Sequence, residues 1–177
     1  MFALTLVTLV VSAFTQSKAV ESIDAIIGSV YDVISGPAGK ERNWERMRRL
    51  FVPDARLIAV GKRAGAEVVR RSMTVEEYIE TSGPVLKEKG FFEKEIARRT
   101  EHYGNIAHVF STYEARSKAD DATPLMRGIN SFQLFNDGKR WWVVTILWQA
   151  EDPSIPLPKK YLKTVARNSQ NEARGRP

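Results

Sequence analysis

Cysteine is absent from this sequence of 177 residues, which excludes disulfide bonds, thiolate metal sites and a thiol nucleophile. Histidine is scarce as well, because His102 and His108 are the two in the chain, too few for a His-rich metal centre. The sequence also lacks a glycine-rich phosphate loop and a nucleophile elbow. We therefore expect neither a metal nor a cofactor.

Long apolar runs are missing too. No stretch reaches the roughly 20 residues that a membrane-spanning helix requires, so we expect no membrane span. The run over residues 2–14 instead has the length of a signal-peptide core, and small residues at Ser17 and Ala19 offer a cleavage site before Val20. We interpret residues 1–19 as a signal peptide and expect a secreted or periplasmic protein. The alternative is an N-terminal helix that packs on a cytoplasmic domain.

Acidic residues are fewer than basic ones, 21 against 27, and the formal net charge is +6. Most of this excess lies in residues 159–177, which contain a single acid, Glu172. We expect these residues to form a basic, disordered tail. The rest of the chain is close to neutral, so the charge does not predict binding to nucleic acid. Residues 20–158 have the length of one domain.

The first part of the chain has the patterns of three helices. Apolar residues recur at helical spacing over 22–35, and a shorter helix is expected over 41–51. A capping box that begins at Thr74 starts the third helix. The sequence leaves open whether that helix ends near residue 83 or continues, kinked, to residue 89.

Segments rich in β-branched and aromatic residues follow, and the Asp137–Gly138 step between the last two is a hairpin signal. Helices followed by an antiparallel meander predict the α+β class. We expect a curved antiparallel sheet, covered by about three N-terminal helices, that forms a cone with a cavity. The expected strands are a short pair over 55–60 and 67–71 and four long ones over 91–103, 106–117, 125–135 and 141–150.

Three segments carry a resemblance to a known family: WERMRRLFVPDARLI at residues 44–58, GNIAHVFSTYE at 104–114 and RGINSFQLFNDGKRWWVV at 127–144. They resemble the nuclear-transport-factor-2-like (NTF2-like) superfamily, which includes the SnoaL-like and ketosteroid-isomerase-like proteins. The resemblance covers about residues 22–151 and implies the fold of that superfamily. It does not imply one activity, because the fold hosts isomerases, cyclases, hydratases and non-catalytic modules.

The isomerase-like members imply where a site would lie. Their tyrosine on the first helix, which donates to a developing oxyanion, corresponds to Tyr31, and their second donor corresponds to Asn130. An asparagine amide is a neutral donor at any pH. Their general base corresponds to Ala59, which cannot accept a proton. Trp148 corresponds to a pocket aromatic. The resemblance thus implies a pocket for a carbonyl or phenol in which the base of the isomerases is missing.

Strand alternation predicts which other side chains share this pocket. If Asn130 points inward, Phe132 does too. A hairpin centred near Asp121 places Thr112 opposite Asn130. The same wall then holds His108, Phe110 and Glu114.

Glu114 and His108 are the candidate acid–base residues on that wall. They lie six residues apart on one strand, roughly 20 Å, so they would contact opposite ends of a ligand. In the alternative interpretation, Glu114 forms a salt bridge with Arg127 or Arg98, and His108 is a half-buried strand residue.

We therefore predict an exported domain that binds a small, mostly apolar molecule, with catalysis left open. One alternative is a SnoaL-like isomerase or hydratase that uses Glu114 or His108 as base; another is a protein-interaction module that uses the outer sheet face. We expect a homodimer, because Trp141 and Trp142 place one indole on each face of the sheet. The predicted ligand-binding residues are Tyr31, Phe110, Thr112, Asn130, Phe132 and Trp148.

Overall fold

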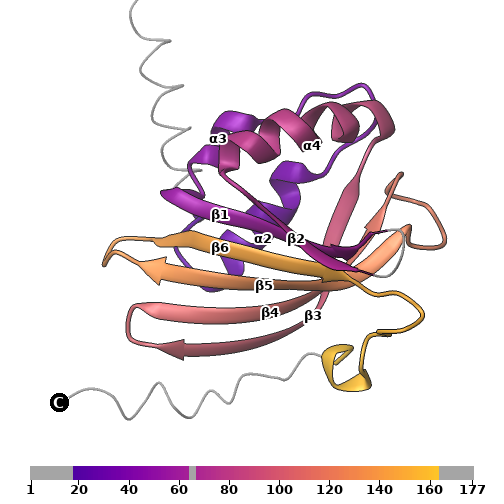
Figure 1. Cartoon of the computed structure of the whole chain (residues 1–177). Helices are drawn as coiled ribbons and strands as arrows, with labels where there is room; N and C mark the ends of the chain where they lie inside the picture. Colours follow the sequence, from indigo (N-terminus) through magenta and orange to yellow (C-terminus); the bar gives the residue numbers. More distant parts are fainter. Residues whose placement is uncertain (1–17, 64–66, 164–177) are drawn as a thin grey trace, which may run out of the picture.

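Helices precede most of the strands along the chain, as the sequence predicted. The computed structural model describes residues 18–63 and 67–163, so most of the expected signal peptide and of the expected tail lies outside the described residues. One curved sheet carries the helices on a single face (Figure 1). The helices are α2 (Ile23–Ile34), α3 (Trp44–Arg48) and α4 (Val75–Lys89), and the strands are β1 (Phe51–Lys62), β2 (Val68–Met73), β3 (Phe92–Tyr103), β4 (Ile106–Arg116), β5 (Met126–Asn136) and β6 (Trp141–Ala150).

Both long helices begin at the caps that the sequence indicated. The side chain of Ser22 accepts a hydrogen bond from the backbone N–H of Ala25, and Thr74 and Glu77 form a capping box. Helix α4 continues through Pro84 to Lys89, which settles the question that the sequence left open. The proline is tolerated because it faces the exposed side, where water can satisfy the carbonyl group that loses its helical partner.

Gly90 follows the last residue of helix α4, and the chain turns sharply there into β3. The φ angle of Gly90 is 71°, in the region that favours glycine. A Cβ atom there would lie 2.8 Å from the carbonyl oxygen of Ser117 and 2.9 Å from the nitrogen of Ala38. Glycine therefore lets three loops meet at the end of α4.

The strand order is β2-β1-β6-β5-β4-β3, and every neighbouring pair is antiparallel except β1 and β6, which are parallel. The prediction of a fully antiparallel sheet was thus wrong at this one junction. The antiparallel expectation comes from hairpins, which join strands that are consecutive in the chain. β1 and β6 are neighbours in the sheet but are the first and last strands along the described part of the chain. The α+β class and the curved sheet beneath helices are confirmed.

The β4–β5 hairpin differs from the predicted register by one residue. Asn130 lies opposite Ser111, not Thr112, and Gly128 lies opposite Tyr113. A one-residue shift moves every side chain of a strand to the other face. Ser111 and Tyr113 are therefore buried beneath the helices, and the even-numbered residues of β4 point to the outer face.

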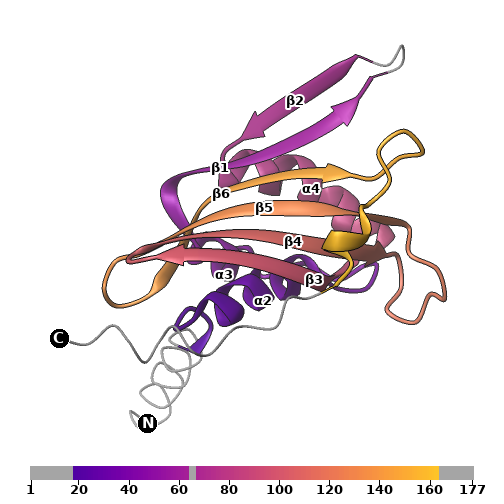
Figure 2. The ribbon, with the colours of Figure 1, turned by 90° about the horizontal axis from the view of Figure 1, so that it is seen from below.

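The core fills the space between the helices and the inner face of the sheet, where Ile26, Val109 and Phe132 are fully buried. The chain leaves β6 and returns across the outer face to a 3-10 turn, Lys159–Tyr161 (Figure 2). This turn lies at the start of the segment that the sequence analysis assigned to the tail. Among the described residues, no helix is long and apolar enough to cross a membrane.

Candidate functional site

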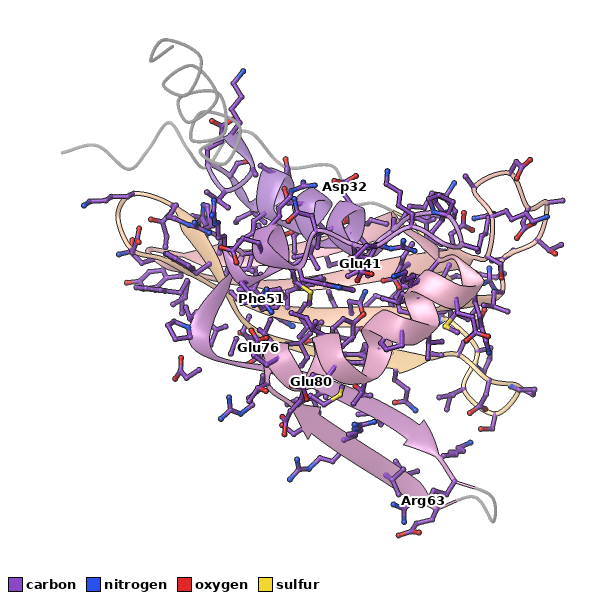
Figure 3. All side chains as sticks on the ribbon, turned by 90° about the horizontal axis from the view of Figure 1, so that it is seen from above. Asp32, Glu41, Phe51, Arg63, Glu76 and Glu80 are labelled. Atoms are coloured by element: carbon purple, nitrogen blue, oxygen red, sulfur yellow. The ribbon has the colours of Figure 1, made fainter. Side chains whose placement is uncertain are left out.

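A pocket of about 470 Å³ lies between the helices and the inner face of the sheet. Figure 3 looks down on the helices that cover it; Phe51, labelled there at the start of β1, is one of the lining residues, and the labelled Glu76 and Glu80 of α4 are exposed. Most of the walls are apolar. They include Val30, Met47, Leu57, Leu86, Phe132, Ile146 and Trp148.

Glu93 of β3 is the one acid among the described lining residues. Burial raises the pKa of its carboxyl group from the ordinary 4.5 to about 7, against the opposing effect of a hydrogen bond from Asn130. Its Oε1 atom accepts that bond at 2.9 Å, and its Oε2 atom accepts none from any described residue. The pocket therefore holds a carboxyl group whose pKa lies near neutral pH and whose Oε2 atom accepts no hydrogen bond from the described residues.

A chain of hydrogen bonds through Asn130, Tyr31 and Ser111 positions this carboxyl group. The amide nitrogen of Asn130 donates to Glu93 and also to the hydroxyl oxygen of Tyr31, at 3.1 Å. The hydroxyl groups of Tyr31 and Ser111 are hydrogen-bonded at 2.7 Å. The backbone N–H of Glu93 donates to Ser35 at the end of α2, at 3.0 Å. Both ends of the Glu93 residue are thus held in place.

Tyr31 and Asn130, which the sequence predicted as donors to a ligand, do lie together. Both amide hydrogens of Asn130 are engaged by the protein, however, and so is the Tyr31 hydroxyl. Their arrangement supports Glu93 and offers a ligand no free N–H. Phe132 and Trp148 line the pocket, where the sequence placed them.

Ala59, the position that the resemblance assigns to the base, pairs with Trp148 in the sheet, and Trp148 pairs with Asn130. Ala59 lies on β1, whereas the carboxyl group of this pocket belongs to β3, the strand at the other edge of the sheet. Glu93 was not among the residues predicted from the sequence, because it stands among other charged residues in the stretch FEKE at 92–95.

The remaining predicted residues lie outside the pocket, on the outer face, because of the register shift. Glu114 pairs with Arg116 and Lys94, and the Arg116 guanidinium holds the pKa of Glu114 below its ordinary value. His108 is hydrogen-bonded to Ser131 at 3.0 Å. The structure brings neither candidate acid–base residue to the pocket.

Phe110 and Thr112 also face outward, where they hold the C-terminal turn. The ring of Phe110 packs on that of Tyr161, with centroids 5.1 Å apart. The hydroxyl group of Thr112 donates to the carbonyl oxygen of Tyr161 at 2.6 Å. In the described structure, these two side chains bind a segment of the chain itself.

Arg42 supports the pocket wall from the side of the loop that follows α2. It is 5% exposed, and its guanidinium donates to the carbonyl oxygens of Ile34, Gly36 and Leu86 at 2.6–3.0 Å. No ion pair of Arg42 occurs among the described residues. This buried cation therefore ties the end of α4 to the end of α2 through backbone groups.

No family model matches the sequence, and no curated protein matches it significantly. Solved structures do resemble it. A protein of unknown function with a cystatin-like fold from Nostoc punctiforme is 13% identical and aligns over 77% of this chain and 92% of its own, with a TM-score of 0.55. A protein of unknown function from Mycobacterium tuberculosis is 16% identical over 76% of this chain and 75% of its own, with a TM-score of 0.56.

An NTF2-like protein of unknown function from Silicibacter pomeroyi is 15% identical over 73% of this chain and 92% of its own, with a TM-score of 0.49. At such identities, a likeness concerns the fold and not the activity. The likeness to the Nostoc punctiforme protein, together with the helices packed on one face of a curved sheet, identifies that fold. The chain therefore has the α+β cystatin/NTF2-like fold, as its sequence motifs predicted.

Proposed function

We propose that the pocket binds a small, mostly apolar molecule and that Glu93 transfers a proton on it. The observation that carries this proposal is the carboxyl group of Glu93, which lines a mostly apolar pocket and has a pKa of about 7. A general base is most effective when its pKa lies near the working pH, because both protonation states are then available. Carboxyl groups with strongly shifted pKa values concentrate at functional sites.

The chemistry that fits is an isomerisation through proton transfer. The free Oε2 atom of Glu93 would take a proton from an acidic C–H group of the ligand, and the electron pair of that bond would stay on the ligand. The same carboxyl group would then return the proton to another atom of the ligand. Atoms and charges balance without a cofactor. The hydrogen bond from Asn130 orients Oε1 and leaves Oε2 for this step.

Two further parts of the proposal concern the whole protein. We infer export, from the apolar run at residues 2–14 and the small residues before Val20. Intact-mass analysis of protein from the native host tests this, and a chain that still begins near Met1 contradicts it. We also infer a homodimer through the outer sheet face, where Leu147 and Ile155 are exposed. Sedimentation that shows a monomer at high concentration contradicts the dimer.

Exchange of ligand hydrogens with solvent tests the proton transfer directly. β-Tetralone is flat, mostly apolar and has acidic C–H groups next to its carbonyl group. In D₂O at neutral pH, we expect the protein to accelerate the loss of these C–H signals, followed by NMR. Replacing Glu93 by Gln should slow the catalysed exchange by about 10²- to 10⁴-fold, the usual contribution of a general base.

Glu114→Gln is the matched control, because Glu114 is also a strand glutamate but lies on the outer face. This variant should exchange β-tetralone at the rate of the wild type. Equal rates for the wild type and Glu93→Gln would overturn the proposed proton transfer.

A further inference from the structure

Two tyrosine hydroxyl groups line the pocket without a hydrogen-bond partner among the described residues. Tyr113 of β4 is 2% exposed, and Tyr78 of α4 is half-buried. Buried hydroxyl groups almost always have a partner, because losing hydrogen bonds to water without replacement is unfavourable. Tyr31 shows the usual pattern, since its hydroxyl group bonds to both Asn130 and Ser111. Tyr78 and Tyr113 depart from it.

The hydroxyl group of Tyr113 occupies space that is open because Gly128 has no side chain. It lies 2.7 Å from the point where a Cβ atom of Gly128 would stand, so glycine at that position leaves the room that the hydroxyl group occupies. Tyr78 reaches the pocket from the opposite side, from the helix layer. Its ring meets the ring of Trp148 edge to face, with centroids 6.4 Å apart.

Both hydroxyl groups lie within electrostatic reach of Glu93. Burial raises the pKa of Tyr78 and of Tyr113, and the charge of Glu93 raises both further. Both tyrosines therefore remain protonated donors at neutral pH. Neither is hydrogen-bonded to Glu93, and all three residues line the same pocket, where a ligand can contact them.

We propose that Tyr113 and Tyr78 donate hydrogen bonds to an oxygen atom of the ligand. The ligand is then a flat, mostly apolar molecule that carries an acceptor oxygen such as a carbonyl group, rather than a plain hydrocarbon. This inference rests on the proposed function, because it assumes that the pocket binds a ligand. It assigns oxygen recognition to β4 and α4, and it leaves Tyr31 the role of positioning Asn130.

A pair of probes of nearly equal shape isolates the oxygen. Methyl β-naphthyl ketone has a carbonyl oxygen where β-isopropylnaphthalene has a methyl group. The fluorescence of Trp148, which lines the pocket, reports the binding of both. With the full chain, we expect the ketone to bind about tenfold more tightly, the combined effect of two ordinary hydrogen bonds. Tyr113→Phe should reduce this preference about threefold, the share of one bond, and leave the hydrocarbon affinity unchanged.

Two controls separate recognition from folding. Tyr161→Phe alters a tyrosine on the outer face, in contact with Phe110, and should leave the preference intact. Tyr113→Phe deletes a hydroxyl group that has no hydrogen-bond partner in the described part of the chain, so the variant should unfold at the wild-type denaturant concentration or above it. If it does not fold, Tyr78→Phe provides the same comparison from the helix side.

The outcomes distinguish this inference from the function on which it rests. Retention of the ketone preference in a Tyr78→Phe, Tyr113→Phe double variant overturns the inference, even if β-tetralone exchange still requires Glu93. Loss of the preference in Tyr31→Phe but not in Tyr113→Phe also overturns it. A wild type that binds neither probe overturns both the inference and the pocket as a ligand site.

Discussion

Asn130 donates a hydrogen bond to Oε1 of Glu93 at 2.9 Å, and this contact joins a central strand to the edge of the sheet. It is the one hydrogen bond that the described residues give to the Glu93 carboxyl group. A carboxylate in water has several such partners, so one bond does not restore the lost solvation. The pocket thus keeps Glu93 close to its titration midpoint at neutral pH.

The first prediction concerns the dependence of stability on pH. The pKa of Glu93 is about 7 in the folded state against an ordinary 4.5, so between these pH values the folded state keeps a proton that the unfolded state has released. The free energy of unfolding should therefore fall as the pH rises from 4.5 to 7, by roughly 2–3 kcal/mol, and then level off.

Urea titrations of the wild type and of Glu93→Gln across this range check the prediction. The difference between the two proteins isolates Glu93, since all other groups are shared. A difference that stays constant with pH would show that Glu93 titrates normally in the folded state.

Gly128 gives the second prediction. A Cβ atom there would lie 2.4 Å from the carbonyl oxygen of Gln149 and 2.7 Å from the Tyr113 hydroxyl oxygen. The Gln149 oxygen belongs to the backbone and cannot swing aside, so Gly128→Ala should lower the free energy of unfolding by roughly 1–3 kcal/mol. It should also weaken the ketone preference by displacing Tyr113. Gly61→Ala, with no atom within 4 Å of the new Cβ atom, is the control and should leave both quantities unchanged.

The sequence predicted more of the fold than of the site, and the β4–β5 hairpin shows why. The Asp137–Gly138 turn is tight, and it was located correctly between β5 and β6, so the inward residues Asn130 and Phe132 were correct. The connection between β4 and β5 has no such turn, so the predicted pairing of these strands was off by one residue. Glu114 was therefore predicted to face the pocket, where the structure has Tyr113.

Glu93 could not have been selected by the same reasoning. It lies on edge strand β3, where a bulge between Glu95 and Ala97 interrupts the alternation of side chains. Its pKa depends on its burial and on the hydrogen bond from Asn130, which is 37 residues away in the chain. The helices and strands could be predicted from caps, breakers and periodicity, which are local features of the sequence. The site depends instead on which faces of the helices and of the sheet pack against each other.

Arg42 gives the third prediction. Its guanidinium satisfies backbone carbonyl groups at the ends of α2 and α4, without an acidic partner among the described residues. Arg42→Met should leave these buried carbonyl groups unpaired and lower the free energy of unfolding by about 2–4 kcal/mol. Arg46→Met removes an exposed ion pair with Asp32 and should change it by less than about 1 kcal/mol. Equal effects in chemical denaturation would mean that Arg42 is not a structural link.

The last prediction concerns the contact between Asn130 and Glu93. Asn130→Leu keeps a similar volume and removes the N–H donors to Glu93 and Tyr31. Because the bond to Glu93 favours the charged carboxylate, its loss should raise the pKa of Glu93 further. The pH at which β-tetralone exchange is half-maximal should then move upward. The free energy of unfolding should fall by about 1–3 kcal/mol, since the remaining partners are left unsatisfied.

Gln133→Leu is the control for this substitution, because Gln133 lies on the same strand but is exposed. It should change neither the exchange midpoint nor the stability appreciably. If Asn130→Leu destabilises the fold while the exchange midpoint stays in place, Asn130 supports the strand without tuning Glu93. A higher midpoint in a variant that still folds shows that the proton affinity of Glu93 is set by Asn130 through this one hydrogen bond.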